Sequence, residues 1–202
     1  MLKSSLETTF EITKLLKYSP RRKNLFNDIK EEMEPGSPGI RSLCPTRWTV
    51  RADAMQSIIK NYKILQELWE QAADVARDTE TIARIQGVVS QMKTFEYFFG
   101  LVFGEMLLRH VDNLSRTLQK PCSTSEGWSI ADMTRRTLQK MRSEENFDLF
   151  WQKINRLTTD LDVAAPLPLR RRKVPKRFRL VMPFQSFLEN LKIITVVYTL
   201  RD

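Results

Sequence analysis

Apolar residues recur every three or four positions through most of residues 49–161, and this spacing constrains the fold more than any other feature of the sequence. It is the spacing of amphipathic α-helices, each of which turns an apolar stripe toward a core. In residues 49–72 the stripe consists of Ala52, Met55, Ile59, Tyr62, Leu65, Trp69 and Ala72. A second run covers residues 78–118, where three glycines argue against one straight helix. The pattern predicts a mainly α fold, an antiparallel helical bundle.

The first 48 residues are expected to contain two helices and one strand. Residues 2–18 and 21–33 have helical spacing, and Pro20 separates them. A loop rich in proline and glycine follows, and Ile40–Cys44 after it is predicted to be a strand. Thr49 is then expected to be the N-cap of the next helix.

Helix-start signals also divide the second half of the chain. Ser123 and Glu126 have the spacing of a capping box, which predicts a helix from there to residue 141. Ser143 is expected to cap a further helix that ends near residue 161. Residues 181–202 combine a helical pattern with a run of high strand propensity, so both structures stay open for this tail.

Basic residues exceed acidic ones, 33 against 24, which gives a net charge of +9. That balance favours contact with polyanions such as nucleic acid. The densest basic cluster consists of Arg170, Arg171, Arg172, Lys173, Lys176, Arg177 and Arg179. Two compatible interpretations remain open for it. One is a solvated, proline-rich linker that includes a nuclear localisation signal. The other is a segment that contacts phosphates.

Several classes of protein are disfavoured. Two cysteines, Cys44 and Cys122, do not make a disulfide framework and suit a reducing compartment. The most apolar window, Tyr97–Gly104, is too short to cross a bilayer, which requires about 20 apolar residues. We therefore expect no membrane partner.

Residues that carry enzyme chemistry are scarce. The single histidine, His110, has no cysteine or carboxylate at metal-ligand spacing, so it is predicted to be a partly exposed helix residue. Asp160 and Asp162 lack the further ligands and the glycine of a calcium loop, and they are expected to end a helix. No glycine-rich phosphate loop is present. The sequence predicts no cofactor, no metal site and no catalytic residue.

Most aromatic residues fall at helical spacing and are expected to pack in the core. They are Trp69, Phe95, Tyr97, Phe98, Phe99, Phe103, Phe147, Phe150 and Trp151. Trp48 stands outside these stripes, beside Arg47, at the joint before the first long helix.

The segment around this joint, LCPTRWTVRADAMQSIIKNYKILQELWEQA at residues 43–72, resembles the hAT transposase superfamily. It is similar above all to the domesticated copies called zinc finger MYM-type proteins. In that family a C-x-TRW-x-x-R segment follows the second catalytic aspartate. The match extends through FEITKLLKYSPRRKNLF upstream and the basic segment downstream, over roughly residues 6–180.

The resemblance implies a ribonuclease-H-like core interrupted by a large helical insertion domain. Three carboxylates of such a core bind divalent metal and cut DNA. The tryptophan of the TRW motif lies beside that active site and stacks on the DNA end, consistent with base extrusion. Carried over, Trp48 is the stacking residue, and Arg47 and Arg51 contact phosphate or hold the segment.

The departures from the family pattern imply a catalytically inactive product. The segments that carry the three metal-binding carboxylates are not found, so no two-metal centre can form. The chain is accordingly expected to be a fragment in four parts. Residues 1–48 are a core remnant, 49–161 the insertion domain, 162–180 a basic linker and 181–202 a divergent tail.

Three functions stay open on this interpretation. The first is weak, sequence-independent DNA contact through Trp48, Arg47, Arg51 and the residues Arg170, Arg171, Arg172, Lys173, Lys176 and Arg177. The second is a protein-interaction scaffold, or self-association, through helix faces that are left exposed. The third is a degenerate product without a selected function. The expected location is the nucleus, with the cytoplasm as the alternative.

Overall fold

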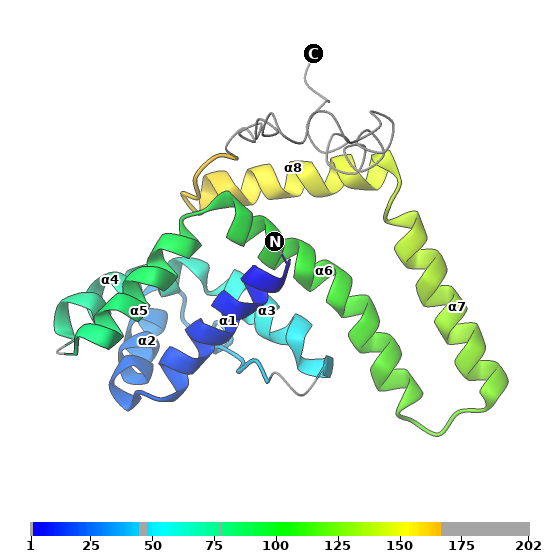
Figure 1. The fold of residues 1–202 in the computed structure, drawn as a ribbon, viewed down its shortest axis with the longest axis horizontal. Helices are drawn as coiled ribbons and strands as arrows, with labels where there is room; N and C mark the ends of the chain where they lie inside the picture. The colour runs from blue at the N-terminus through cyan, green and yellow to red at the C-terminus, as the bar shows by residue number, and fades with distance from the viewer. Residues whose placement is uncertain (1, 45–47, 77, 167–202) are drawn as a thin grey trace, which may run out of the picture. The chain divides into compact units, whose positions relative to one another are not determined.

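The computed structural model describes residues 2–44, 48–76 and 78–166, and residues 1–166 form one compact unit. The described residues form eight α-helices and one short 3-10 helix, with no β-strand among them. In chain order these are α1 (Leu2–Lys17), α2 (Pro20–Met33), η1 (Trp48–Val50), α3 (Arg51–Lys60), α4 (Tyr62–Val75), α5 (Thr79–Met92), α6 (Phe95–Leu118), α7 (Thr124–Lys140) and α8 (Glu144–Asp160). The predicted mainly helical fold is confirmed (Figure 1).

Two of the predicted helix starts are confirmed by their capping bonds. The Ser123 hydroxyl accepts the N–H of Glu126 at 3.3 Å, and the Ser123 N–H donates to the Glu126 carboxylate at 2.8 Å. This reciprocal pair is the capping box that begins α7. At the start of α8, Ser143 accepts the N–H of Asn146 at 3.4 Å. The helix ends at Asp160, as expected.

The strand predicted at Ile40–Cys44 is wrong. These residues have no regular structure, and the Arg41 N–H donates to the hydroxyl of Ser57 on α3 at 2.9 Å. A strand needs a neighbouring strand to satisfy its backbone groups. The described residues offer none, and a helix side chain takes the bond.

The helix predicted to run unbroken from Thr49 to Ala72 is interrupted at Asn61, between α3 and α4. The Asn61 side chain is fully buried and donates to the carbonyls of Pro38 at 2.8 Å and Ser57 at 2.7 Å. Asparagine side chains compete with helical backbone bonds in this way. At this break the Asn61 side chain therefore connects the loop before α3 to the joint between α3 and α4.

Two other helix boundaries differ from the expectation. The run of residues 78–118 does divide into two helices, but the division falls at Lys93 and Thr94, and the glycines lie inside the helices. The Thr94 hydroxyl caps α6 by accepting the N–H of Tyr97 at 3.3 Å. Thr49 is not the N-cap of α3. It lies within η1, and Val50 precedes the first helical residue.

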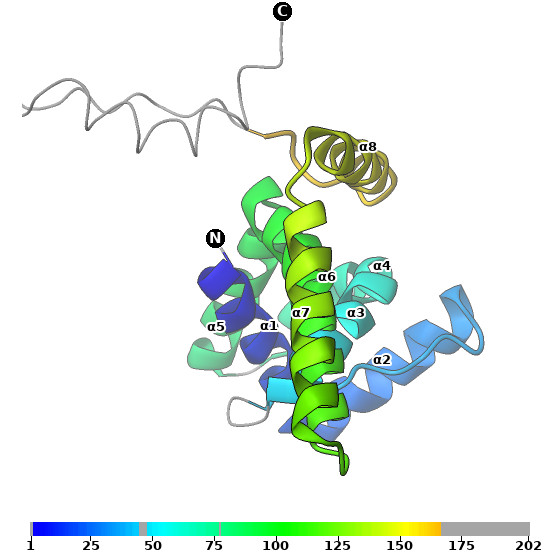
Figure 2. The ribbon, with the colours of Figure 1, turned by 90° about the vertical axis from the view of Figure 1, so that its right-hand side faces the viewer.

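Helix α6 occupies the centre of the packing. It packs against α3 on one side and against α1 on the other. Figure 2, in which α7 lies in front of α6, shows this arrangement. At Gly104 the side chains of both neighbouring helices approach α6 closely. A Cβ atom there would lie 2.5 Å from Leu2 on α1 and 2.9 Å from Met55 on α3. Although α6 has 24 residues, neither it nor any other described helix is long and apolar enough to cross a membrane.

The first two helices belong to this core. Ile12 and Leu15 of α1 are fully or almost fully buried, and Phe26 and Ile29 of α2 are buried where α2 meets α4. An ion pair between Arg84 of α5 and Glu11 of α1 adds a polar contact at the edge. Residues 2–33 therefore share one apolar core with α3–α6.

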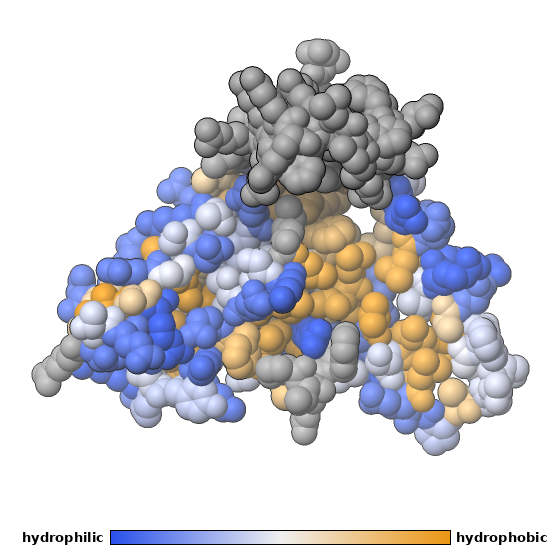
Figure 3. Space-filling model, viewed as in Figure 1, coloured by the Kyte–Doolittle hydropathy of each residue, from blue (hydrophilic) through white to orange (hydrophobic). Residues whose placement is uncertain are grey.

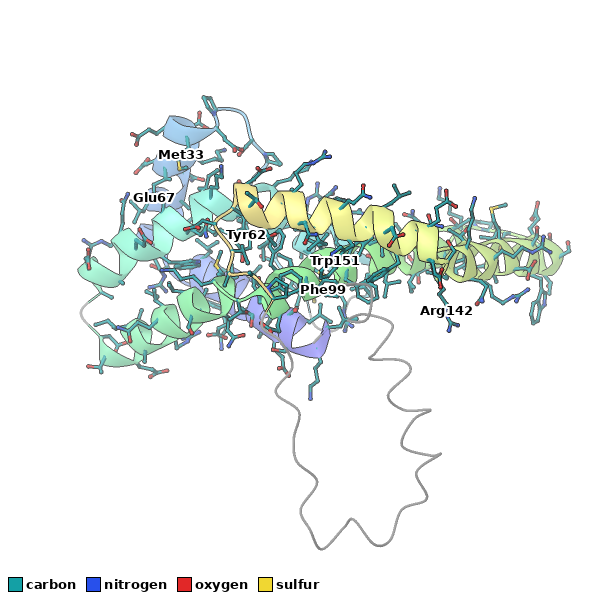
Figure 4. All side chains as sticks on the ribbon, turned by 90° about the horizontal axis from the view of Figure 1, so that it is seen from above. Met33, Tyr62, Glu67, Phe99, Arg142 and Trp151 are labelled. Atoms are coloured by element: carbon teal, nitrogen blue, oxygen red, sulfur yellow. The ribbon has the colours of Figure 1, made fainter. Side chains whose placement is uncertain are left out.

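Six of the nine aromatic residues predicted for the core pack together where α8 crosses the first half of α6: Phe95, Phe99, Phe103, Phe147, Phe150 and Trp151. Phe99 lies 5.5 Å from Phe150 and 6.4 Å from Trp151 between ring centroids, and Phe95 lies 5.8 Å from Trp151. Figure 4 shows Phe99 and Trp151 beside each other at this crossing. The rings hold α8 against α6 in edge-to-face and tilted contacts.

Candidate functional site

The Arg-Trp joint is only partly covered by the structure. Arg47 lies outside the described residues, as do Arg170, Arg171, Arg172, Lys173, Lys176 and Arg177. The backbone of Trp48 begins η1, and Arg51 is the half-buried first residue of α3. What the structure defines at this joint is how η1 and the first turn of α3 are held in place.

The first turn of α3 is capped by a residue far away in sequence. Val50 provides no side-chain bond, which would leave backbone N–H groups without partners. Asp112 of α6 fills this role, because its carboxylate accepts the N–H of Ala52 at 3.2 Å. The Asp112 side chain is buried, with 2% of its surface exposed. A negative group at this position also suits the positive end of the α3 dipole.

A second carboxylate in the same turn, Asp53, binds two arginines of α6. Arg109 donates to it at 2.5 Å and Arg116 at 2.7 Å, and Arg116 also donates to the Thr49 carbonyl at 2.7 Å. Arg109 is itself held by Glu105 at 2.7 Å. The joint is thus fixed to one side of α6 by charge-assisted hydrogen bonds.

The two carboxylates differ in their ionisation. Burial raises the pKa of Asp112 above its usual value, and the hydrogen bond from Ala52 offsets only part of this effect. Burial also tends to raise the pKa of Asp53, but the hydrogen bonds from Arg116 and Arg109 outweigh it, and the pKa lies below the usual value. Asp53 is therefore an ion-pair partner with its charge neutralised.

These acidic groups do not form a metal site. Within the described residues no group of three or more histidine, cysteine, aspartate or glutamate side chains is placed to hold a metal ion. His110 lies half-buried on α6, the exposure predicted for it. The described residues of the joint position the start of α3.

A different feature, missed from the sequence, lies on the other side of α6. Helix α7 has 17 residues, and none of them is buried. Trp128 is 74% exposed and Met133 is 66% exposed. Contiguous exposed apolar surface, more than any single exposed side chain, is typical of sites that contact another protein. The sequence showed that α7 is amphipathic, but not that none of its residues would be buried.

Helices α6 and α7 line an apolar groove of about 400 Å³, which begins at Ala131, three residues after Trp128. Its lining includes the apolar residues Val111 and Leu114 of α6 and Ala131 and Leu138 of α7, together with Arg135 and Arg142. Figure 3 shows apolar surface that continues from the middle of α6 toward α7. We call Trp128, Met133 and the four apolar groove residues the α7 surface.

Comparison of the chain with protein-family models, with curated protein sequences and with solved structures found no match. The assignment of a function therefore depends on the residues and the geometry described above.

The opposite pKa shifts at the joint predict opposite pH dependences for two variants. Asp53 stabilises the fold in its charged form, so its contribution is present above pH 4 and is lost as the pH falls through its lowered pKa. We expect Asp53→Asn to lower the free energy of unfolding by about 1–2 kcal/mol at pH 7 and by less at pH 3.

Asp112→Asn keeps an acceptor for Ala52 but removes a charge that burial disfavours. Its free energy of unfolding should rise relative to the unmodified protein between pH 3 and pH 7, because the raised pKa costs stability as Asp112 ionises. Denaturant unfolding at pH 3, 5 and 7 measures both differences. The same pH trend in the two variants would contradict these assignments.

Proposed function

We propose that residues 2–166 are a helical protein-interaction module whose contact area is the α7 surface. The observation that carries this proposal is the absence of any buried residue in α7, combined with the exposure of Trp128 and Met133. The core of α1–α6 forms without α7 and presents it at one edge. A partner that covers the α7 surface would bury the apolar side chains of α7 that α6 leaves exposed.

Burial of the α7 surface would stabilise a complex through its apolar area and its residue composition. Moving a side chain such as Met133 from water into an apolar contact is worth about 1.5–3 kcal/mol. Tryptophan is enriched among the few residues that dominate binding energies at protein interfaces. The groove beside Trp128 supplies the concave apolar surface that such contacts require.

Affinity capture with the full chain tests this function when it is combined with hydrogen exchange. We expect a captured partner to slow amide exchange in residues 124–140, and Trp128→Ala with Met133→Ala to reduce capture at least tenfold. Both side chains are exposed, so the double variant should keep its fold and stability. Leu149→Ala, which truncates another exposed apolar side chain on α8, is the matched control.

Capture that is unchanged in the double variant would contradict the proposal. Exchange protection that falls on helices other than α7 would contradict it equally, because the contact would then lie elsewhere.

We propose weak, sequence-independent DNA contact as a second function, on the distribution of charge. Nine of the 33 basic residues and two of the 24 acidic residues lie in 167–202. Residues 1–166 therefore hold 24 basic against 22 acidic residues, a net +2, and +7 of the total +9 falls in the last 36 residues. The resemblance of the TRW segment to hAT transposases supports a transposase-derived, catalytically inactive protein of the nucleus.

A salt titration of DNA binding tests this contact. We expect replacement of Arg170, Arg171, Arg172 and Lys173 by alanine to weaken binding at low salt and to reduce the slope of log K against log salt by about 3–4. The control removes the same charge from exposed positions on the helices, Lys60, Lys63, Lys153 and Arg156. Equal losses in both variants, or magnesium-dependent cleavage of the DNA, would contradict the proposal.

A further inference from the structure

We infer that the turn between α1 and α2 binds a single strand of nucleic acid, with phosphates at Lys17 and Lys23 and an unpaired base stacked on Tyr18. We call residues 14–23 the basic turn. The inference goes beyond the DNA contact proposed above, because it uses none of the residues assigned there and adds a preference for unpaired strands. Three observations carry it: cations without acidic partners, their unfavourable position on α2 and the exposed tyrosine among them.

The basic turn has an excess of positive charge that the nearly neutral balance of residues 1–166 conceals. Residues 12–27 contain five basic residues and no acidic one. Lys17 and Lys23 are exposed, and neither forms an ion pair with a carboxylate of the described residues. The acidic residue that precedes them, Glu11, is already paired with Arg84. A polyanion at the basic turn would therefore meet two cations that no described side chain neutralises.

The position of the cations on α2 is unfavourable for that helix. Arg21, Arg22 and Lys23 occupy the first turn of α2, which contains no acidic residue. Positive charges at a helix N-terminus oppose the helix dipole, and α7 and α8 begin with glutamates instead. Helix stability therefore gives no reason for cations at this position, whereas a bound anion would offset their repulsion.

Lys17 and Lys23 line one hollow from two different helices. Lys17 ends α1 and Lys23 lies near the start of α2, where the two helices meet (Figure 1). The hollow has a volume of about 230 Å³, and the exposed polar residues Asn27 and Ser42 also line it. None of the described residues that line it is acidic. Two ammonium groups with amide and hydroxyl donors beside them are the groups that bind phosphate oxygens.

The two arginines of the basic turn have a different setting. Arg21 and Arg22 line a separate hollow, which they share with the acidic residues Asp28 and Asp78. The Arg22 Nε–H donates to the carbonyl of Leu15 at 2.9 Å, so this side chain holds the start of α2 against the end of α1. The phosphate contact is therefore assigned to the two lysines, and Arg22 positions the turn that presents them.

Tyr18 supplies the preference for a single strand. Its side chain is 70% exposed, and the ammonium group of Lys17 lies 5.7 Å from the centroid of its ring. Exposed aromatic rings beside cations are the surfaces on which unpaired bases stack in proteins that bind single strands. The bases of a duplex are paired and stacked on each other, so a duplex would contact only the lysines.

Fluorescence anisotropy with the full chain tests the phosphate contact, using a labelled single-stranded oligonucleotide and the duplex of the same sequence. Replacement of Lys17 and Lys23 by alanine should weaken single-strand binding about tenfold at low salt and reduce the slope of log K against log salt by about 1–1.5. The matched control replaces Lys120 and Lys153, which are also exposed, and removes the same charge. The control should leave the affinity and the slope nearly unchanged.

Tyr18→Ala tests the stacking contact in the same assay. We expect it to weaken single-strand binding about fivefold or more and to leave duplex binding unchanged. Tyr18→Phe keeps the ring and should bind like the unmodified chain. All the substituted side chains are exposed, and circular dichroism would verify that each variant keeps its helical content.

Single-strand binding that the double lysine variant leaves unchanged, or that falls equally in the control, would overturn the inference. Equal losses on single strand and duplex in Tyr18→Ala would contradict the stacked base. Vesicles rich in phosphatidylserine that bind as tightly as the oligonucleotide, and that lose binding in the same variants, would identify a membrane surface as the ligand instead.

These failures are distinguishable from failure of the DNA contact proposed above. A chain whose DNA binding falls only when Arg170, Arg171, Arg172 and Lys173 are replaced excludes the basic turn and leaves that contact standing. A chain that binds no oligonucleotide at low salt removes both.

Discussion

Helix α6 contacts α3 along one stripe of its surface, and the packing of the remaining helices depends on that stripe. Positions 104, 108, 112 and 116 are four residues apart and therefore follow one side of α6. At one end Gly104 leaves room for the side chain of Met55. At the other end Asp112 and Arg116 bind the backbone of the first turn of α3 and of η1.

Close apolar contact and long-range capping thus set the register between α3 and α6. This register in turn fixes the position of the joint that follows the Arg-Trp pair. Because α1 packs on another side of the same helix, α6 is covered by both halves of the core.

That arrangement also explains why α7 is left uncovered. The first half of α6 makes the aromatic contacts with α8. Its second half binds η1 and the first turn of α3 through Asp112 and Arg116, and it also contacts α7. Helix α7 meets α6 on one side and keeps its capping box and amphipathic pattern without entering the core. The buried apolar core and the exposed apolar surface therefore lie in different parts of the chain. Residues 2–118 hold most of the buried apolar side chains, and α7 holds the most exposed large one, Trp128. The excess positive charge lies in a third place, residues 167–202, so the proposed protein contact and the proposed DNA contact involve different parts of the chain.

The sequence allowed prediction of those features that depend on local spacing. Helical periodicity indicated the helices, and the Ser123–Glu126 pair indicated the start of α7, because both signals involve residues within one or two turns.

Features that depend on contacts between residues far apart in the chain could not be predicted from the sequence. The division at Asn61 follows from bonds to the loop at Pro38, and the cap of α3 comes from a residue 60 positions away. The strand at residues 40–44 was wrong for the same reason, since strand formation depends on a neighbour that only the fold supplies. The exposure of α7 was missed because an amphipathic stripe does not reveal which partner covers it. The DNA-contacting assignments for Arg47, Trp48, Arg51 and the basic segment remain predictions.

The close approach at Gly104 is the central claim of this account, and a pair of glycine substitutions measures it most directly. Gly87 lies exposed in α5 with nothing within 4 Å of a Cβ atom, so Gly87→Ala should raise the free energy of unfolding by about 0.5–1 kcal/mol through helix propensity alone. At Gly104 the added atoms would collide with the side chain of Leu2 and with that of Met55, which is fully buried. Gly104→Val should therefore lower the free energy of unfolding by about 1–3 kcal/mol. A Gly104→Val protein as stable as the unmodified chain, or more stable, would show that α6 does not depend on this contact.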